Sequence, residues 1–174
     1  MNLTIFCSGK NNLKKDYIEE IEKLIKNIDI NKISIVYGGG NVGLMGVVRD
    51  SFISIGGKII TSNINKFVVE GIFDDYIFDN INERQQKLIE LGDAYLILPG
   101  GFGTMFEMLE VIIKNQIGES KKPILIFNFN NIYDYLLKEI KVLQEENFIQ
   151  HELNYYNIYV FNNSDELIHK INNL

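Results

Sequence analysis

The chain has 174 residues, of which 46% are hydrophobic and 23% charged, and its formal net charge is −6. This length supports one well-packed core and is short for two domains of ordinary size, so we expect a single domain spanning residues 1–174. The 17 Lys and Arg are scattered and outnumbered by 23 Asp and Glu, which excludes a basic surface for nucleic acid but leaves room for a single nucleotide held by backbone amides.

The only cysteine is Cys7, so no intrachain disulfide and no thiolate metal cluster can form. His151 and His169 lie far apart and lack metal-ligand spacing, and we expect no metal. The N-terminal segment lacks the order of a signal peptide, and no apolar window approaches the roughly 18 residues that a membrane span needs. These features predict a cytoplasmic protein with no membrane partner.

Seven short β-rich runs alternate with segments of helical period. The runs are 3–7, 33–37, 58–62, 75–79, 94–99, 123–128 and 157–162. Helical segments are expected at 13–28, 42–55, 82–91, 103–117 and 131–146 and from Asp165, and an irregular stretch follows the third run. Near-continuous apolar strands that alternate with helices predict an α/β fold, a doubly wound, mostly parallel sheet of about seven strands with helices on both faces. Ligands of such sheets bind beyond the carboxyl ends of the strands.

Two of the loops that follow strands are rich in glycine: YGGGNVGLMG at 37–46 and PGGFGT at 99–104. Glycine permits positive φ and close approach of a ligand to the backbone, and free amides at a helix N-terminus favour an anion. Both loops are candidate phosphate cradles, and two tight turns without a ligand are the alternative. The candidate residues are Gly39, Gly40 and Gly43 in the first loop and Gly100, Gly101, Phe102, Gly103 and Thr104 in the second.

The first loop also spells G-x-G-x-x-G at Gly38, Gly40 and Gly43, a pattern of dinucleotide sites. However, it follows the second strand, and the next strand ends in Thr61-Ser62-Asn63 without an acid for a ribose hydroxyl. A dinucleotide site is therefore the least favoured interpretation.

The helical segment 103–117 carries one polar stripe of Thr104, Glu107, Glu110 and Lys114 on a mostly apolar surface, which predicts burial. Glu107 stands about 4.5 Å beyond Thr104 along the helix axis, near the sugar of a nucleotide whose 5′-phosphate Thr104 holds. A carboxylate there can stabilise an oxocarbenium-like charge or activate water, and a solvated glutamate is the alternative. Pairing with Lys114 accounts for Glu110.

Arginine is rare in this lysine-rich chain, which has only Arg49 and Arg84. Arg84 opens the helix that leads to the AYLILPGG strand. Its planar guanidinium can bind a phosphate or carboxylate through two hydrogen bonds. The alternative is a surface arginine near the start of a helix. We interpret Arg49 as structural, and Cys7 as a packing residue that could line the pocket.

These segments resemble the Lonely Guy family of cytokinin-activating phosphoribohydrolases. The resemblance rests on YGGGNVGLMG, NERQQ and LPGGFGTMFEMLEVIIKNQIG, which contains the hallmark P-G-G-x-G-T-x-x-E, and it covers essentially the whole chain. It implies a Rossmann-like fold, commonly dimeric, without cofactors. The implied activity is hydrolysis of the N-glycosidic bond of N6-modified adenosine 5′-monophosphates to free base and ribose 5-phosphate. Members are often labelled lysine decarboxylase, but nothing in the sequence suggests a pyridoxal-phosphate lysine site.

The resemblance places the catalytic pair on Arg84 and Glu107 and phosphate binding on the second glycine loop. We therefore expect a small nucleotide, AMP or an N6-substituted AMP, as substrate. We also expect a homodimer with segment 103–117 close to the partner. The rival interpretation is a carrier or sensor that holds a nucleotide- or pterin-type phosphate without turning it over.

The chain departs from the family at several positions. Gln85 stands where lysine is usual, Phe106 where a second acid is usual, and Ile113 where threonine is common. The first strand ends CSGK rather than the usual CGSS. These departures leave the catalytic pair intact and the base preference open. Gln85, Ser8 and Glu70, which matches an acid after the third strand in other members, are further candidates for the site.

Overall fold

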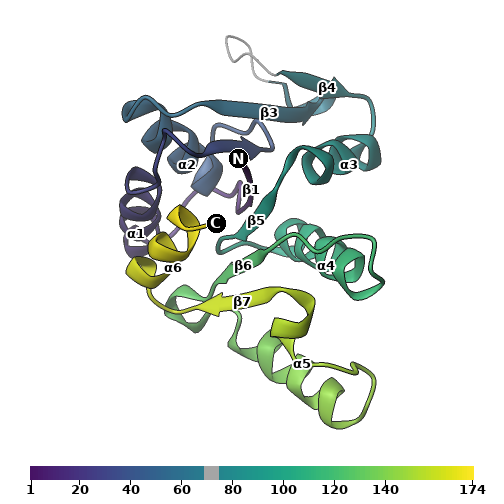
Figure 1. Ribbon diagram of the computed structural model, residues 1–174. Helices are drawn as coiled ribbons and strands as arrows, with labels where there is room; N and C mark the ends of the chain where they lie inside the picture. The colour runs from purple at the N-terminus through teal and green to yellow at the C-terminus, as the bar shows by residue number, and fades with distance from the viewer. Residues whose placement is uncertain (69–74) are drawn as a thin grey trace.

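A parallel sheet forms the centre of the computed structural model, which describes residues 1–68 and 75–174 (Figure 1). Within these residues the sheet has seven strands in the order β4-β3-β2-β1-β5-β6-β7, and every pairing is parallel. The strands are β1 (Asn2–Phe6), β2 (Ser34–Tyr37), β3 (Ile59–Ile64), β4 (Tyr76–Phe78), β5 (Ala94–Ile97), β6 (Ile124–Phe127) and β7 (Ile158–Phe161). The predicted α/β sheet is confirmed, and each expected run overlaps an observed strand.

Helices cover both faces of the sheet, as the sequence predicts. In Figure 1, α1, α2 and α6 lie on one side and α3, α4 and α5 on the other. The helices are α1 (Lys15–Lys26), α2 (Gly43–Ser54), α3 (Ile81–Leu91), α4 (Phe102–Gln116), α5 (Asp134–Glu145) and α6 (Ser164–Asn172). Short 3₁₀ turns occupy Asn65–Phe67, Phe129–Asn131 and Leu153–Tyr156.

The core is divided into two layers by the sheet. Side chains such as Leu3 and Leu96 pack under α1, α2 and α6, whereas Phe6 and Ile97 pack under α3 and α4. All four residues of β5 are buried. Strands covered on both faces need apolar side chains in both directions, which explains the continuous apolar runs in the sequence.

The strand order reverses between β1 and β5, which pair from Leu3 with Ala94 to Phe6 with Ile97. Beyond these strands, the Ser8 amide donates to the Pro99 carbonyl at 3.2 Å. The Ser8 carbonyl accepts from the amide of Leu44 at 2.8 Å. The end of β1 therefore ties the two glycine loops together at the switch point, where doubly wound sheets bind ligands.

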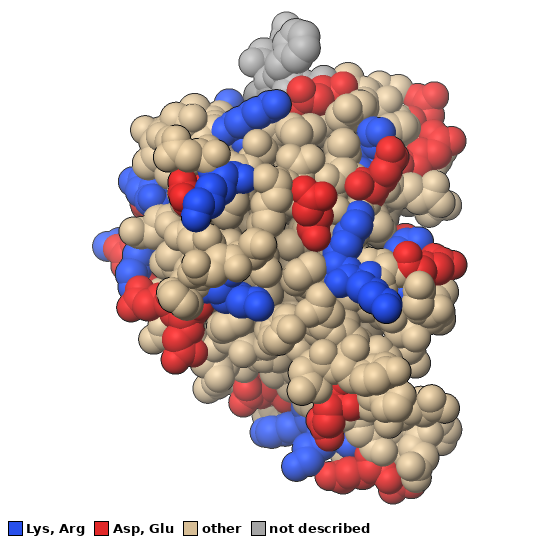
Figure 2. Space-filling model, in the orientation of Figure 1, with Lys and Arg blue, Asp and Glu red and all other residues tan. Residues whose placement is uncertain are grey.

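Acidic and basic side chains are interspersed on the face of the molecule drawn in Figure 2. This mixture accords with the scattered charges of the sequence. Within residues 1–68 and 75–174, none of the helices has the length and apolar character required to span a bilayer.

Candidate active site

Helix α3 positions Arg84 at the carboxyl edge of the sheet. Asn80 caps the start of the helix: its side-chain oxygen accepts from the Glu83 amide at 2.9 Å and satisfies one of the free amides of the first turn. The Arg84 Nε donates to the Ser62 carbonyl of β3 at 3.0 Å, and its Nη1 donates to Glu107 Oε1 at 2.7 Å. Two segments distant in sequence thus fix the guanidinium between β3 and α4.

The first glycine loop leaves room for this guanidinium. A Cβ at Gly38 would lie 2.0 Å from Nη2 of Arg84, so only glycine accepts the observed position of Arg84. A Cβ at Gly40 would lie 2.6 Å from Cε of Met45. Gly38, which belongs to the G-x-G-x-x-G pattern but was not a predicted site residue, is therefore the glycine of this loop that lies against Arg84.

The other two predicted glycines of this loop shape the start of α2. Gly39 and Gly43 have φ values of 76° and 59°, in the region that favours glycine. A Cβ at Gly43 would lie 2.5 Å from the Lys10 carbonyl oxygen. The next two amides, of Leu44 and Met45, both donate to the Ser8 carbonyl. Glycine is therefore required at position 43 because the neighbouring backbone leaves no room for a side chain.

The second glycine loop is open on its outer side. Gly101 caps α4 without a side-chain hydrogen bond, and a Cβ at Gly101 or Gly103 would meet nothing within 4 Å among the described atoms. Phe102 is 91% exposed. A Cβ at Gly100 would lie 2.0 Å from Oγ1 of the buried Thr104, so that glycine is required by packing. Residues 101–103 are exposed, so the start of α4 is open to an anion, which the helix dipole favours.

Tyr133, which no sequence motif singled out, supports this loop from beneath. Its hydroxyl donates to the Leu98 carbonyl at 2.7 Å, and the side chain is buried. Burial raises the pKa of the Tyr133 hydroxyl, and contact with the Gly100 backbone opposes the increase. No local pattern marks Tyr133, because its role depends on where the start of α5 meets the end of β5.

The Arg84–Glu107 pair is largely buried, with both side chains 14% exposed. Burial raises the pKa of the Glu107 carboxyl above its usual range, while the Arg84 guanidinium opposes the increase and Glu110 adds to it. Burial likewise raises the pKa of the Cys7 thiol, with a further increase from Glu107. Cys7 is thus a neutral thiol beside the pair, and Glu107 is a carboxylate whose proton affinity the site has increased.

One expectation for α4 is wrong. Lys114 pairs with Glu119 at 3.4 Å rather than with Glu110, whose buried Oε2 has no hydrogen-bond partner among the described residues. Thr104 lies on the buried face of the helix, as does Met108.

The further candidates fall in different places. Gln85 is buried beside the Arg84–Glu107 pair, and its Oε1 accepts from Arg84 Nη1 at 3.3 Å. Ser8 bridges the two glycine loops through its backbone and accepts from the Lys10 amide through Oγ. Glu70 lies outside the described residues. Elsewhere, Arg49 pairs with its neighbour Asp50.

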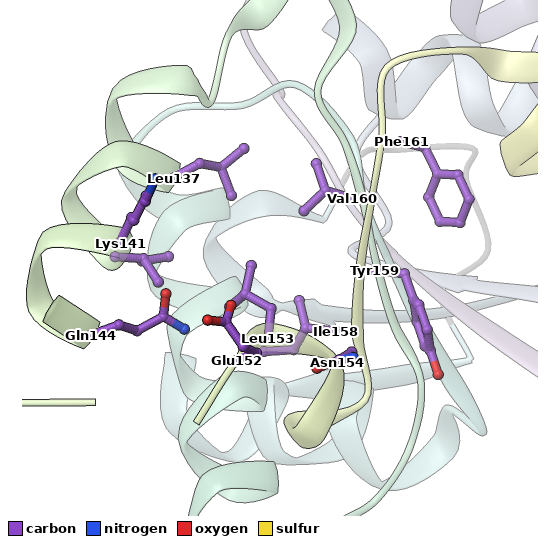
Figure 3. A pocket seen from close by; sticks show the side chains of 11 residues that line it. Leu137, Lys141, Gln144, Glu152, Leu153, Asn154, Ile158, Tyr159, Val160 and Phe161 are labelled. Carbon is purple, nitrogen blue, oxygen red and sulfur yellow. The ribbon is translucent and has the colours of Figure 1, made fainter. Parts of the chain in front are cut away.

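No group of three or more His, Cys, Asp or Glu within residues 1–68 and 75–174 is arranged to hold a metal ion. A cavity of about 570 Å³ lies between α5 and β7, away from the Arg84–Glu107 pair (Figure 3). Leu137 of α5 faces Val160 of β7 there, and the walls are mostly apolar. Because this cavity holds neither of the glycine loops nor a buried ion pair, the chemistry points to the switch point instead.

The sheet, the glycine loops at its switch point and the buried ion pair define a Rossmann-like α/β protein with a carboxylate–guanidinium site. Residues 42–171 match the family model described as "Possible lysine decarboxylase". A probable cytokinin riboside 5′-monophosphate phosphoribohydrolase of Arabidopsis thaliana, LOG6, is 34% identical over 85% of this chain and 76% of its own length. The enzyme of that name from Rhodococcoides fascians is 30% identical over 85% of this chain and 78% of its own. The chain belongs to the family of these phosphoribohydrolases, which confirms the resemblance to Lonely Guy proteins.

The match to two further relatives, from Oryza sativa subsp. japonica, spans 61% and 62% of those longer proteins. Among solved structures, the molybdenum cofactor binding protein of Rippkaea orientalis has a TM-score of 0.68 at 16% identity. That likeness covers 99% of this chain and 95% of the other. At such low identity it establishes the shared fold alone.

Proposed function

We propose that this protein hydrolyses the N-glycosidic bond of a nucleoside 5′-monophosphate, AMP or an N6-substituted AMP, to free base and ribose 5-phosphate. The observation that carries the proposal is the buried pair of Arg84 and Glu107, 2.7 Å apart, beside the open N-terminus of α4. The names of the relatives in the same family support the same reaction class.

In this proposal the 5′-phosphate binds at the start of α4, where the amides and helix dipole favour an anion. Glu107, one turn further along the same helix, then faces the ribose. As the bond between C1′ and the base breaks, the base leaves with the electron pair and takes up a proton. Glu107 stabilises the positive charge on the sugar or orients the water whose hydroxyl completes ribose 5-phosphate. Arg84 orients the carboxylate and balances its charge.

Hydrolysis requires Glu107 to be ionised in this mechanism. Desolvation raises its pKa, and the hydrogen bond from Arg84 opposes that increase. A partly desolvated carboxylate is also less stabilised by water, so it interacts more strongly with a developing cation. Activity should therefore fall as the pH drops through the pKa of Glu107.

The rival function is a carrier that binds a phosphate-bearing ligand without cleaving it. Its specific support is the shared fold with the molybdenum cofactor binding protein. The buried Arg84–Glu107 pair favours the hydrolase, because a carrier has no need of a desolvated carboxylate one turn from its phosphate site. Turnover separates the two: a carrier would bind ligand and release no base.

We also propose that the active form is a homodimer built around α4. Along that helix, five large apolar side chains spaced three or four residues apart are exposed by 42–91%: Phe102, Phe106, Leu109, Ile113 and Ile117. This spacing places them on one face of the helix. Apolar surface of this extent commonly marks a protein interface, and a two-fold contact is the commonest arrangement. Because Glu107 lies on the same helix, association would border the site.

The test incubates the protein with AMP, N6-isopentenyl-AMP and adenosine and measures free base and ribose 5-phosphate. Both nucleotides should release base, and adenosine should be a poor substrate, since binding of the remote phosphate positions the sugar against Glu107. Glu119→Gln, an exposed glutamate beyond the end of α4, is the matched control for Glu107→Gln and should keep full activity. Absence of base release from both nucleotides would refute the hydrolase, and equal kcat/KM for adenosine and AMP would refute the phosphate site.

A further inference from the structure

Gln85 is an unusual residue for its position in the molecule. It is 2% exposed on the inner side of α3, among buried side chains such as Leu88 and Ile89. Its Oε1 accepts from Arg84, but its buried Nε2 has no hydrogen-bond partner among residues 1–68 and 75–174. A buried amide donor without a partner destabilises a fold, so an apolar side chain would suit the core better.

The contacts of Arg84 connect Gln85 to the carboxylate. The same atom, Nη1 of Arg84, donates at 3.3 Å to Gln85 Oε1 and at 2.7 Å to Glu107 Oε1. The two acceptor oxygens are therefore no farther apart than the combined length of these hydrogen bonds. A charge placed at the end of side chain 85 would therefore lie close enough to the Glu107 carboxyl to change its pKa strongly.

The other ionisable groups around Glu107 are few. Arg84 of α3 is the cation that acts on it within the described part of the chain. Glu110, one turn further along α4, is a like charge, and the Cys7 thiol at the end of β1 is neutral because burial raises its pKa. The pKa of Glu107 is thus lowered by one guanidinium and raised by burial and by a second carboxylate. Because Gln85 is neutral, it adds no charge that would change this pKa.

We propose that Gln85 is a positioning residue: its side-chain carbonyl holds the Arg84 guanidinium against Glu107, and its neutrality leaves Arg84 as the sole counter-ion of that carboxylate in the part of the chain that the structure describes. The residue acts through Arg84 and does not touch the substrate. This inference rests on the proposed function only for its effect on rate, because the ionisation of Glu107 can be measured without turnover.

The experiment places opposite charges at position 85 and titrates Glu107 directly. Carbon-13 NMR follows the Glu107 carboxyl with pH in the wild type, Gln85→Glu and Gln85→Lys, and the signal is assigned by its loss in Glu107→Gln. The titration midpoint should rise in Gln85→Glu, whose carboxylate competes for Arg84, and fall in Gln85→Lys. Each change should be roughly one pH unit or more.

Gln86 supplies the matched control, because it is the same residue type at the next position and is exposed. Gln86→Glu and Gln86→Lys should move the midpoint much less, since solvent and salt screen an exposed charge. Unchanged midpoints in both variants at position 85, or equal changes at position 86, would overturn the assignment. Gln85→Glu is nearly isosteric and carries the test alone where circular dichroism shows that Gln85→Lys does not fold.

A rate measurement extends the test where the wild type releases base. In the plot of kcat against pH, the midpoint of the acidic limb should shift in the same directions as the NMR midpoints. Gln85→Met, which removes the acceptor and the unpartnered donor together, should lower kcat about tenfold or more with little change in KM, because Arg84 loses one of its anchors. A Gln85→Met enzyme with wild-type kcat would overturn the positioning role. A wild type that releases no base would refute the proposed function and leave the NMR result standing.

Discussion

Gly38→Ala tests whether the position of Arg84 matters for activity. The new Cβ would lie 2.0 Å from Nη2 of Arg84. Non-bonded heavy atoms rest about 3.5–4.0 Å apart, so the guanidinium must retreat by roughly 1.5 Å. Such a movement breaks the 2.7 Å contact with Glu107. Because misplacement of a catalytic group by about 1 Å can cost a hundredfold in rate, we expect kcat/KM to fall by about 10- to 100-fold.

The same substitution should have little effect on stability. Nη2 is the end of a flexible side chain that can move, and Gly38 does not have the positive φ that makes alanine strained. We expect the melting temperature to change by no more than about 2–4 °C, which corresponds to roughly 1 kcal/mol for a chain of this size. The assays are base release from AMP and a thermal melt followed by circular dichroism.

Gly92→Ala is the matched control. Its Cβ would lie 2.3 Å from Oγ1 of Thr4, a comparable clash at the opposite end of α3 from Arg84. The Thr4 hydroxyl donates to the Leu88 carbonyl at 3.0 Å, so this variant should melt at a lower temperature and keep its kcat. If Gly38→Ala folds and retains kcat/KM within about twofold of the wild type, then Arg84 does not need its contact with Glu107 for activity.

Three further substitutions test the site and the assembly. Glu107→Gln should bind nucleotide but lose about a hundredfold or more in kcat, measured by base release; a near-normal kcat would remove Glu107 from the mechanism. The pKa of Glu107 is raised in the folded state, so the protonated carboxyl contributes to folding stability at low pH. That contribution is lost as the pH rises through the pKa of the folded state. Glu107→Gln should therefore melt above the wild type at about pH 8 and converge with it toward about pH 4; the reverse order would contradict the direction of the pKa change. Arg84→Lys keeps the charge but loses the planar fork, so base release should be slow, and full activity would make Arg84 a generic cation. Ile113→Glu places a charge within the exposed apolar row of α4 and should yield monomers in light scattering, whereas an unchanged dimer would locate the interface elsewhere.

Local patterns in the sequence were sufficient to predict the secondary structure. A strand such as 94–97 shows as an apolar run, and a helix such as 15–26 shows as apolar residues at steps of three and four. Arg84 stands out in the sequence because arginine is rare in this chain, and Glu107 because it lies on a mostly apolar helix; both also match a family motif. These signals lie within short stretches of chain, so no knowledge of the fold is needed to read them.

Helix α4 shows where local reasoning fails. Its abundant apolar residues predict burial, but they do not say what covers them: five are exposed in the single chain, and their burial by a second protomer stays a prediction. The predicted pairing of Glu110 with Lys114 is wrong, because Lys114 reaches Glu119 in the following turn instead. Helical periodicity says which residues share a face, but only the neighbouring elements decide which face is covered and which partner a flexible side chain meets.

The site itself depends on the tertiary structure. Periodicity identifies β1 and β5 but does not reveal that they are neighbours, because the strands are far apart in sequence. Asn2 and Asp93, which form a hydrogen bond at the start of the two strands, are 91 positions apart. The order of strands follows from long-range packing of the helices on both faces, which no short segment encodes. Only that order brings Gly38 against Arg84, the Ser62 carbonyl to its Nε, and Glu107 to its Nη1. The sequence alone thus determined which residues could do the chemistry, and packing across the switch point decided which of them meet.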